Sequence, residues 1–143
     1  MKKPVPGRQG AVATAPIDSD FTRAGVRRIS IPKDALNGVV DVFMQIGYVG
    51  DVARLYAGGR LLDDDFFKGT VWEIGLKRFM NGALAGSLQL KILPLRKDSP
   101  FYIPRGAWPF FPPSGEICDV RRITASPEYE VIIAVGSADS RAH

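Results

Sequence analysis

The sequence has 143 residues, of which 45% are hydrophobic and 24% are charged. These values are typical of one globular domain, large enough to bury a core without disulfides or metal ions. The formal net charge is +4, and the lysines and arginines occur in scattered pairs among acidic residues. A nucleic-acid-binding protein is expected to gather its basic residues on one face, so we expect no nucleic-acid partner.

The sparse cysteine and histidine content excludes several kinds of chemistry. Cys118 is the single cysteine and His143 the single histidine, so neither a disulfide framework nor a histidine-based catalytic triad or metal centre is expected. Cys118 is expected to be a buried, inert thiol. No apolar run reaches the roughly 18 residues needed to span a membrane, so no membrane partner is expected. Met1, Lys2 and Lys3 are similar to the start of a signal peptide, but the polar, Pro/Gly-rich residues 4–10 that follow provide no apolar core, so we expect no signal peptide in this chain and assign no compartment.

The predicted elements are short strands separated by turn signals. Residues 1–20 are predicted to be a linker or extended arm, residues 21–136 a β-sandwich domain, and residues 137–143 a frayed tail. Gly47 to Gly50 should end the second strand, and Pro94 should end the sixth. Alternation and β-rich composition place the strands at residues 26–31, 39–46, 51–57, 60–62, 70–76, 87–93, 117–123 and 129–135.

The connections carry their own signals. Gly58 and Gly59 stand between two strand patterns and predict a hairpin turn with positive φ at both positions. Residues 63–69 are expected to form an acidic, aromatic loop, and residues 81–86 a flexible loop. Residues 98–116 are rich in proline and aromatic residues and are expected to be irregular. With no long amphipathic helix, the pattern predicts an all-β sandwich or jelly roll.

Four carboxylates could carry chemistry. Asp63, Asp64 and Asp65 are adjacent, and Glu73 follows Trp72. Three adjacent acids can be a solvated loop, or they can supply the oxygen ligands of a calcium ion. A third alternative is a small glycosidase that uses Glu73, Asp63 and Asp65, which requires two carboxyl groups facing one cleft. No cofactor other than calcium is expected.

Several segments resemble a known family. Residues 50–56, 58–64, 69–79 and 90–98 are similar to the β-rich C-terminal region of glycoside hydrolase family 35 β-galactosidases and related bacterial proteins. The resemblance covers residues 25–105 and is most specific at 72–79. It implies an all-β, jelly-roll, galactose-binding-domain-like fold in a periplasmic or secreted parent protein. The family's catalytic glutamates lie in a TIM barrel, which this chain is too short to contain.

The resemblance implies a non-catalytic carbohydrate-binding or accessory domain. Sugars are held by exposed aromatic platforms and by planar polar side chains. Arg54 and Tyr56 share a strand face, whereas Trp72 and Glu73 point to opposite faces, and Trp108 in its proline-rich loop is an alternative platform. The candidate ligand-binding residues are Arg54, Tyr56, Trp72, Glu73, Lys77, Arg78 and Trp108.

Some of these residues also have structural interpretations. Trp72 and Tyr56 can be core residues, and Arg54 can form a partly buried ion pair. The whole chain can be a purely structural domain that packs on the catalytic domain of a larger glycoside hydrolase or forms a homodimer. That hypothesis predicts an exposed apolar patch of several hundred square ångströms.

Overall fold

The computed structural model describes residues 5–7, 10–12, 16–79, 87–98 and 103–136. These residues form strands and three short 3₁₀ helices joined by turns. The strands are β1 (Val5–Gly7), β2 (Gly10–Val12), β3 (Gly25–Ser30), β4 (Asp41–Val49), β5 (Val52–Ala57), β6 (Arg60–Phe66), β7 (Trp72–Gly75), β8 (Ser87–Ile92), β9 (Leu95–Arg96), β10 (Glu116–Ile117) and β11 (Asp119–Glu128). The 3₁₀ helices are η1 (Asp18–Arg23), η2 (Lys77–Phe79) and η3 (Arg105–Ala107).

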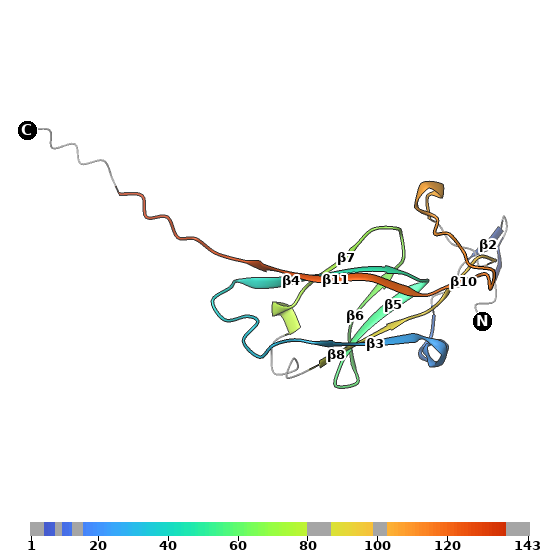
Figure 1. Ribbon diagram of the computed structural model, residues 1–143, viewed down its shortest axis with the longest axis horizontal. Coiled ribbons are helices and arrows are strands. Elements are labelled where there is room, and N and C mark those ends of the chain that lie inside the picture. The colour runs from blue at the N-terminus through green and yellow to red at the C-terminus, as the bar shows by residue number, and fades with distance from the viewer. Residues whose placement is uncertain (1–4, 8–9, 13–15, 80–86, 99–102, 137–143) are drawn as a thin grey trace, which may run out of the picture.

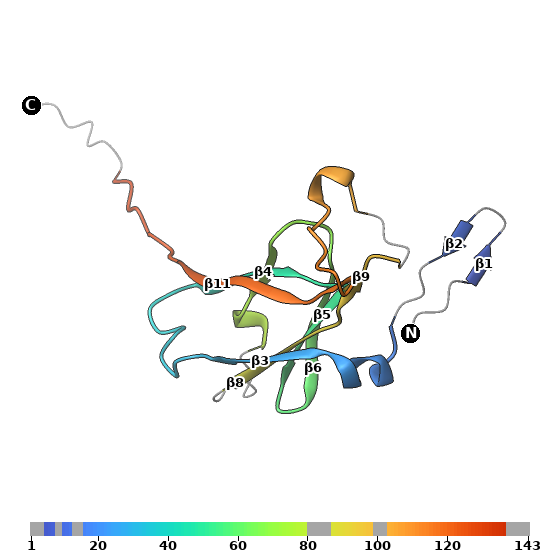
Figure 2. The same cartoon turned by 45° about the vertical axis from the view of Figure 1, so that its right-hand side comes forward.

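Two antiparallel sheets make up the body of the molecule. One has three strands in the order β11-β4-β7, and the other has four in the order β3-β8-β5-β6. In Figures 1 and 2, β11 lies beside β4 in one layer and β3 lies beside β8 in the other. The small pairs β1-β2 and β9-β10 complete the described strands. The prediction of an all-β fold built from antiparallel strands is confirmed.

Alternating side chains from both sheets form one core. On β4, Val42, Met44, Ile46 and Tyr48 are buried while the residues between them are half-buried, and β8 buries Leu88, Leu90 and Ile92. The prediction that these three β8 residues face the core is confirmed. Each such aliphatic side chain contributes about 1.5–3 kcal/mol when it leaves water. The remaining core residues come from β5, β7 and the turn after β7: Ala53, Leu55, Ala57, Trp72, Ile74 and Leu76.

The predicted glycine hairpin is confirmed. Gly58 and Gly59 have φ values of 54° and 79° and join β5 to β6, with Ala57 paired to Arg60. Leu62 is an extra residue on β6, because Tyr56 pairs with Leu61 whereas Leu55 pairs with Asp63. This β-bulge sets which acidic side chains of β6 face inward.

Several strand predictions are wrong. The strand predicted at 117–123 is split into β10 and β11, and β11 continues to Glu128. The second strand continues through Gly47 to Val49, because β11 supplies a hydrogen-bonding neighbour along its whole length. The acidic residues at 63–65 belong to strand β6 and not to a loop, because β5 pairs with them. The strand predicted at 129–135 is absent: residues 129–136 have no regular structure and are exposed. Among the residues that the structure describes, no strand lies beside them to complete a ladder.

Two other predictions concern residues outside the described part of the chain: the flexible loop at 81–86 and the tail at 137–143. Among the described residues, no helix is long and apolar enough to cross a membrane. As predicted, residues 103–116 are largely irregular, with η3 as their one helical turn.

Candidate functional site

The outer face of the three-stranded sheet carries two rows of side chains that run across β11, β4 and β7. In one row Thr124, Gln45 and Glu73 are paired neighbours. In the next row Arg122 pairs with Gly47, and Val71 lies just before β7 on the opposite side of β4. These six residues line a depression of about 460 Å³, which we call the outer-sheet groove.

Gly47 forms the floor of the outer-sheet groove because it has no side chain. Its neighbours on β4 that share this face, Phe43 and Gln45, are half-buried and stand above the sheet. A Cβ placed on Gly47 would lie 3.6 Å from the Arg122 carbonyl oxygen and 3.8 Å from the next nearest atoms. A small side chain would therefore fit at this position. The backbone does not require a glycine here, and the space above Gly47 is open.

Hydrogen bonds fix the orientation of Gln45 at the centre of the face. Its Nε2 donates to Oε2 of Glu73 at 3.2 Å. Its Oε1 accepts from the hydroxyls of Thr124 at 3.2 Å and Ser126 at 3.4 Å. The amide therefore lies between a carboxylate and two hydroxyls, and this network holds its plane in one position.

Arg122 and Phe43 add a charged group and a ring to the same face. Arg122 is exposed and makes no ion pair with any residue that the structure describes. The Phe43 ring lies over Gly75, since a Cβ on that glycine would come within 3.4 Å of Phe43 Cε1. The face therefore offers an aromatic ring, a carboxylate, a carboxamide and a guanidinium, the groups that bind sugar faces and hydroxyl edges.

Of the predicted ligand-binding residues, Glu73 alone lines this groove. Arg54 is buried on the outer face of the other sheet, where η1 covers it. Its guanidinium lies 4.2 Å from the centre of the Phe21 ring, and Nη1 donates to Asp18 at 2.6 Å. Nη2 donates to the Pro16 carbonyl at 3.2 Å. Arg54 therefore anchors the N-terminal arm to the sheet and is closed to a ligand.

Tyr56, Lys77 and Arg78 lie apart from the groove. The ring of Tyr56 is half-buried on β5, under the ammonium group of Lys91 at 4.9 Å. Lys77 is exposed, and its backbone N–H donates to Asp41 at 2.8 Å. Arg78 pairs with Asp63 at 2.6 Å and stacks on Phe79. The interpretation of these residues as one sugar site is not supported by their positions.

The two tryptophans have different environments. Trp72 is 6% exposed and packs edge-on against Tyr48 in the core, so the prediction that it is a platform is wrong and its alternative as a core residue is confirmed. As predicted, Glu73 points to the opposite face. Trp108 is 49% exposed, and its Nε1 donates to the Ile103 carbonyl at 2.8 Å.

The Trp108 segment, which consists of η3 and Trp108 (residues 105–108), lies next to the loop between β6 and β7. A Cβ on Gly69 in that loop would lie 2.5 Å from Cβ of Ala107, the residue before Trp108. The same loop continues to Val71, which lines the groove. Figure 2 shows η3 above this loop. The Trp108 segment therefore lies against the loop that supplies one wall of the groove.

The predicted acidic constellation does not come together. On β6, Asp63 and Asp65 are paired with the inward-facing residues Leu55 and Ala53, whereas Asp64 is paired with Arg54 on the other face. Glu73 lies on the outer face of the opposite sheet. Within the described residues, no group of three or more carboxylate, histidine or cysteine side chains could hold a metal ion. The geometry therefore supports neither the calcium site nor a glycosidase pair that includes Glu73.

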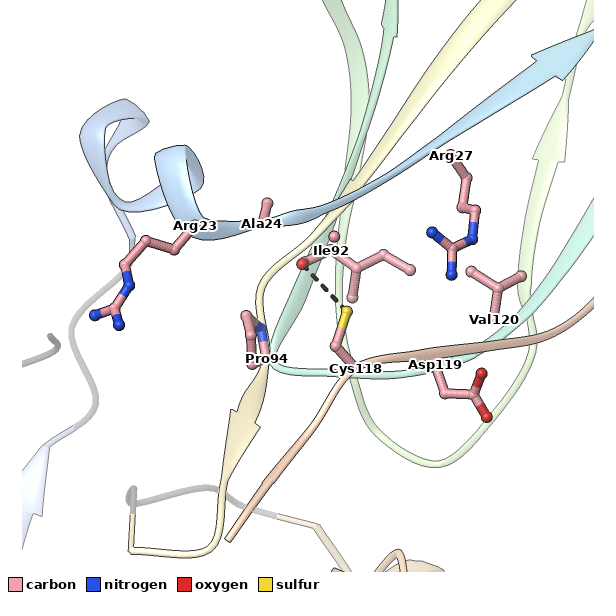
Figure 3. A pocket seen from close by; sticks show the side chains of 9 residues that line it. Arg23, Ala24, Arg27, Ile92, Pro94, Cys118, Asp119 and Val120 are labelled. Atoms are coloured by element: carbon pink, nitrogen blue, oxygen red, sulfur yellow. Dashed lines mark hydrogen bonds between the residues drawn. The ribbon is translucent and has the colours of Figure 1, made fainter. Parts of the chain in front are cut away.

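A second cavity, of about 300 Å³, lies where β3 faces the start of β11. Figure 3 shows Cys118 at its centre, with the sulfur directed at the Ile92 carbonyl 3.5 Å away, while Arg27 extends toward Val120 and Arg23 points outward. As a residue Cys118 is exposed, so the prediction of a buried thiol is wrong, although its side chain lines the cavity. Burial nevertheless raises the pKa of its thiol above the usual value, so the thiolate nucleophile is disfavoured here.

Sequence reasoning missed six residues in or beside the groove: Phe43, Gln45, Gly47, Val71, Arg122 and Thr124. The alternation at 39–46 separates Phe43 and Gln45 from the core residues Val42 and Met44, and this signal could have identified their shared face. The pairing of that face with Arg122 and Thr124 depends on the β11 register, in which Arg121 is an extra residue. Comparisons with protein-family models, curated proteins and solved structures each found no match to this chain.

Proposed function

We propose that this chain is a non-catalytic carbohydrate-binding or accessory module of a glycoside hydrolase, and that the outer-sheet groove is its sugar-contact surface. The observation that carries the proposal is the pair of polar rows around Gly47, in which Gln45, Glu73 and Arg122 surround an open floor. Planar groups of this kind bind adjacent sugar hydroxyls through paired hydrogen bonds.

The resemblance to the C-terminal region of family 35 β-galactosidases supports the same proposal. It suggests a jelly-roll, galactose-binding-like arrangement for the two antiparallel sheets and galactose-containing or plant-type polysaccharides as ligands. In this proposal the half-buried Phe43 ring offers an apolar surface to a sugar face beside the groove. Trp108, on the segment that contacts the β6–β7 loop, extends the surface for a longer glycan.

The test is a titration of the purified chain with β-galactosides, xylan, mannan and cellulose, followed by calorimetry and by assay of released reducing sugar. We expect saturable binding without product. Arg122→Ala should weaken binding, because it removes the guanidinium at the groove. Arg28→Ala is the matched control, since Arg28 is exposed on β3 in the other sheet.

The possible outcomes separate the hypotheses. Loss of binding in Arg122→Ala with an unchanged Arg28→Ala variant supports the groove. Equal loss in both variants would show that the guanidinium at the groove has no special part in binding and would contradict the proposal. Absence of binding to every glycan in the panel also contradicts it, and turnover that disappears in Glu73→Gln would make the chain a hydrolase.

A further inference from the structure

Residues 129–135, with the sequence Tyr-Glu-Val-Ile-Ile-Ala-Val, form an exposed apolar segment beyond the last strand. The exposed fractions of Val131, Ile132 and Ile133 are 77%, 87% and 79%. In Figure 1 the chain leaves the end of β11 and leads away from the body at this point. Burial of each large aliphatic side chain would be favourable by about 1.5–3 kcal/mol of transfer free energy.

The composition of the segment is that of a strand. Tyrosine, valine and isoleucine have high β-propensity, and the segment contains neither proline nor glycine. Such a run of six or seven residues with little charge pairs readily with another strand. Nothing in the described part of the chain pairs with residues 129–135, so among the described residues both edges of this segment are open.

We propose that this segment pairs with the same segment of a second copy of the chain, antiparallel about a two-fold axis at Ile132. A two-fold interface requires a surface that is complementary to itself. The 129–135 segment meets this requirement when it pairs with its own copy. Tyr129 then faces Val135 of the second copy, and Val131 faces Ile133, so one side of the ribbon is wholly apolar. On the other side Ile132 faces its own equivalent and Glu130 faces Ala134, so no like charges meet.

The preceding strand limits pairing to the 129–135 segment. The Glu128 carbonyl accepts from the Val40 N–H at 2.8 Å, so Glu128 directs its polar backbone groups toward the β4 side. The adjacent Pro127 therefore faces the free edge of β11, where it offers no N–H. A proline at this position obstructs a strand that would pair alongside β11 itself, whereas residues 129–135 carry a donor at every position.

Analytical ultracentrifugation of the intact chain over a wide range of protein concentration tests the association. We expect a monomer–dimer equilibrium. Ile132→Asp should weaken dimerisation by at least about tenfold, because it places two carboxylates opposite each other. Phe110→Asp is the matched control, since Phe110 is also exposed and apolar, at 93%, but lies outside the segment. Circular dichroism of each variant verifies that the fold is retained.

Cysteine crosslinking in a Cys118→Ser background tests the pairing. Facing residues in an antiparallel pair have Cα atoms about 4.5–5.5 Å apart, within the reach of a disulfide. Ile132→Cys should therefore form a covalent dimer on oxidation. Glu130→Cys should not, because its equivalent in the second copy lies four positions along the strand, about 13 Å away.

Each result decides for or against the proposal. Dimerisation lost in Ile132→Asp alone, with crosslinking at position 132, supports it. A monomer at all concentrations overturns it, as does equal loss of dimer in Phe110→Asp. Equal crosslinking at positions 130 and 132 shows parallel, in-register pairing and overturns the antiparallel arrangement. Binding of a different protein by a chain that stays monomeric on its own also overturns the second copy as the partner.

Discussion

The Tyr48 hydroxyl on β4 donates to Asp65 on β6 and so joins the two sheets, with 2.8 Å to the carboxylate Oδ2 and 3.0 Å to the Asp65 main-chain oxygen. The tyrosine ring is buried and also contacts Phe67 and Trp72 edge-on. Burial, followed by the nearby Asp65 charge, raises the pKa of Tyr48 well above its usual value, so its hydroxyl remains a donor at all ordinary pH values.

Replacing Tyr48 by phenylalanine should lower the free energy of unfolding by about 1–3 kcal/mol, because Asp65 then loses its donor in a poorly solvated position. Urea denaturation followed by circular dichroism measures this change. Tyr129→Phe is the control, since Tyr129 is exposed, and it should leave stability unchanged. A Tyr48→Phe variant as stable as the parent would show that the inter-sheet hydrogen bond contributes nothing net.

The pH dependence of stability should report on Asp65. Burial, with repulsion from Asp63 and Asp64, raises the pKa of Asp65 despite the opposing effects of the Tyr48 hydrogen bond and Lys68. A carboxyl with a raised pKa in the folded state binds its proton more readily there than in the unfolded chain. Its stabilising contribution is therefore complete below the unfolded pKa of about 3.9 and is lost as the pH rises through the folded pKa.

Comparison with Asp65→Asn isolates this contribution, because the amide does not titrate. The unfolding free energy of the parent relative to Asp65→Asn should increase as the pH falls from 7 toward 4. Urea denaturation of both proteins at several pH values measures the difference. A difference that decreases on acidification would mean that the folded pKa of Asp65 is lowered, contrary to the geometry.

Two glycines, Gly47 on β4 and Gly50 directly after it, should respond in opposite ways to alanine. Gly50→Ala places a Cβ against Cγ2 of Ile92 and 2.8 Å from the Leu93 carbonyl oxygen, closer than real Cβ atoms approach such neighbours. That overpacking should cost about 1–3 kcal/mol. Gly47→Ala meets no atom closer than 3.6 Å and should leave stability unchanged or slightly higher.

Thermal denaturation distinguishes the two glycine variants.

Gly47→Ala also tests the proposed groove, because its methyl group begins to fill the floor without distorting the sheet. The expected result is weaker glycan binding at full stability. The control is Gly106→Ala, whose new methyl group would meet no atom within 4 Å. Unchanged glycan affinity in Gly47→Ala would place the sugar elsewhere.

The N-terminal arm should depend on packing more than on its ion pair. Arg54 and Asp18 are 2.6 Å apart, but the Asp18 side chain is 97% exposed, so Asp18→Ala should cost less than about 1 kcal/mol. Phe21 is buried between the Arg54 guanidinium and the small cluster of Val52 and Leu93. Phe21→Ala should cost more, about 3 kcal/mol, because it leaves a cavity.

Limited proteolysis together with urea denaturation measures both effects on the arm. Phe21→Ala should accelerate cleavage near η1, whereas Asp18→Ala should not. An Asp18→Ala variant that is the less stable of the two would show that the ion pair, and not the aromatic contact, secures the arm.

Local patterns in the sequence determined the strand class, the glycine hairpin and the buried side of β8, because each depends on residues close together in the chain. Leu88, Leu90 and Ile92 alternate strictly, and Gly58 and Gly59 accept positive φ without steric conflict. Trp72 and Glu73 point to opposite faces of β7 because successive side chains of a strand alternate between its two faces.

Tertiary structure decided the features that depend on which strands become neighbours. Residues 63–65 are strand because β5 pairs with them, while residues 129–135 have a stronger β-composition but no described strand beside them. Arg54 is buried because the distant η1 covers it. The groove unites Gln45, Glu73 and Arg122 because β4 lies between β7 and β11 in one register. The period-two pattern of a strand sets which face each side chain takes, but a shift of two residues preserves that pattern, so the pattern alone does not select the partner of each residue.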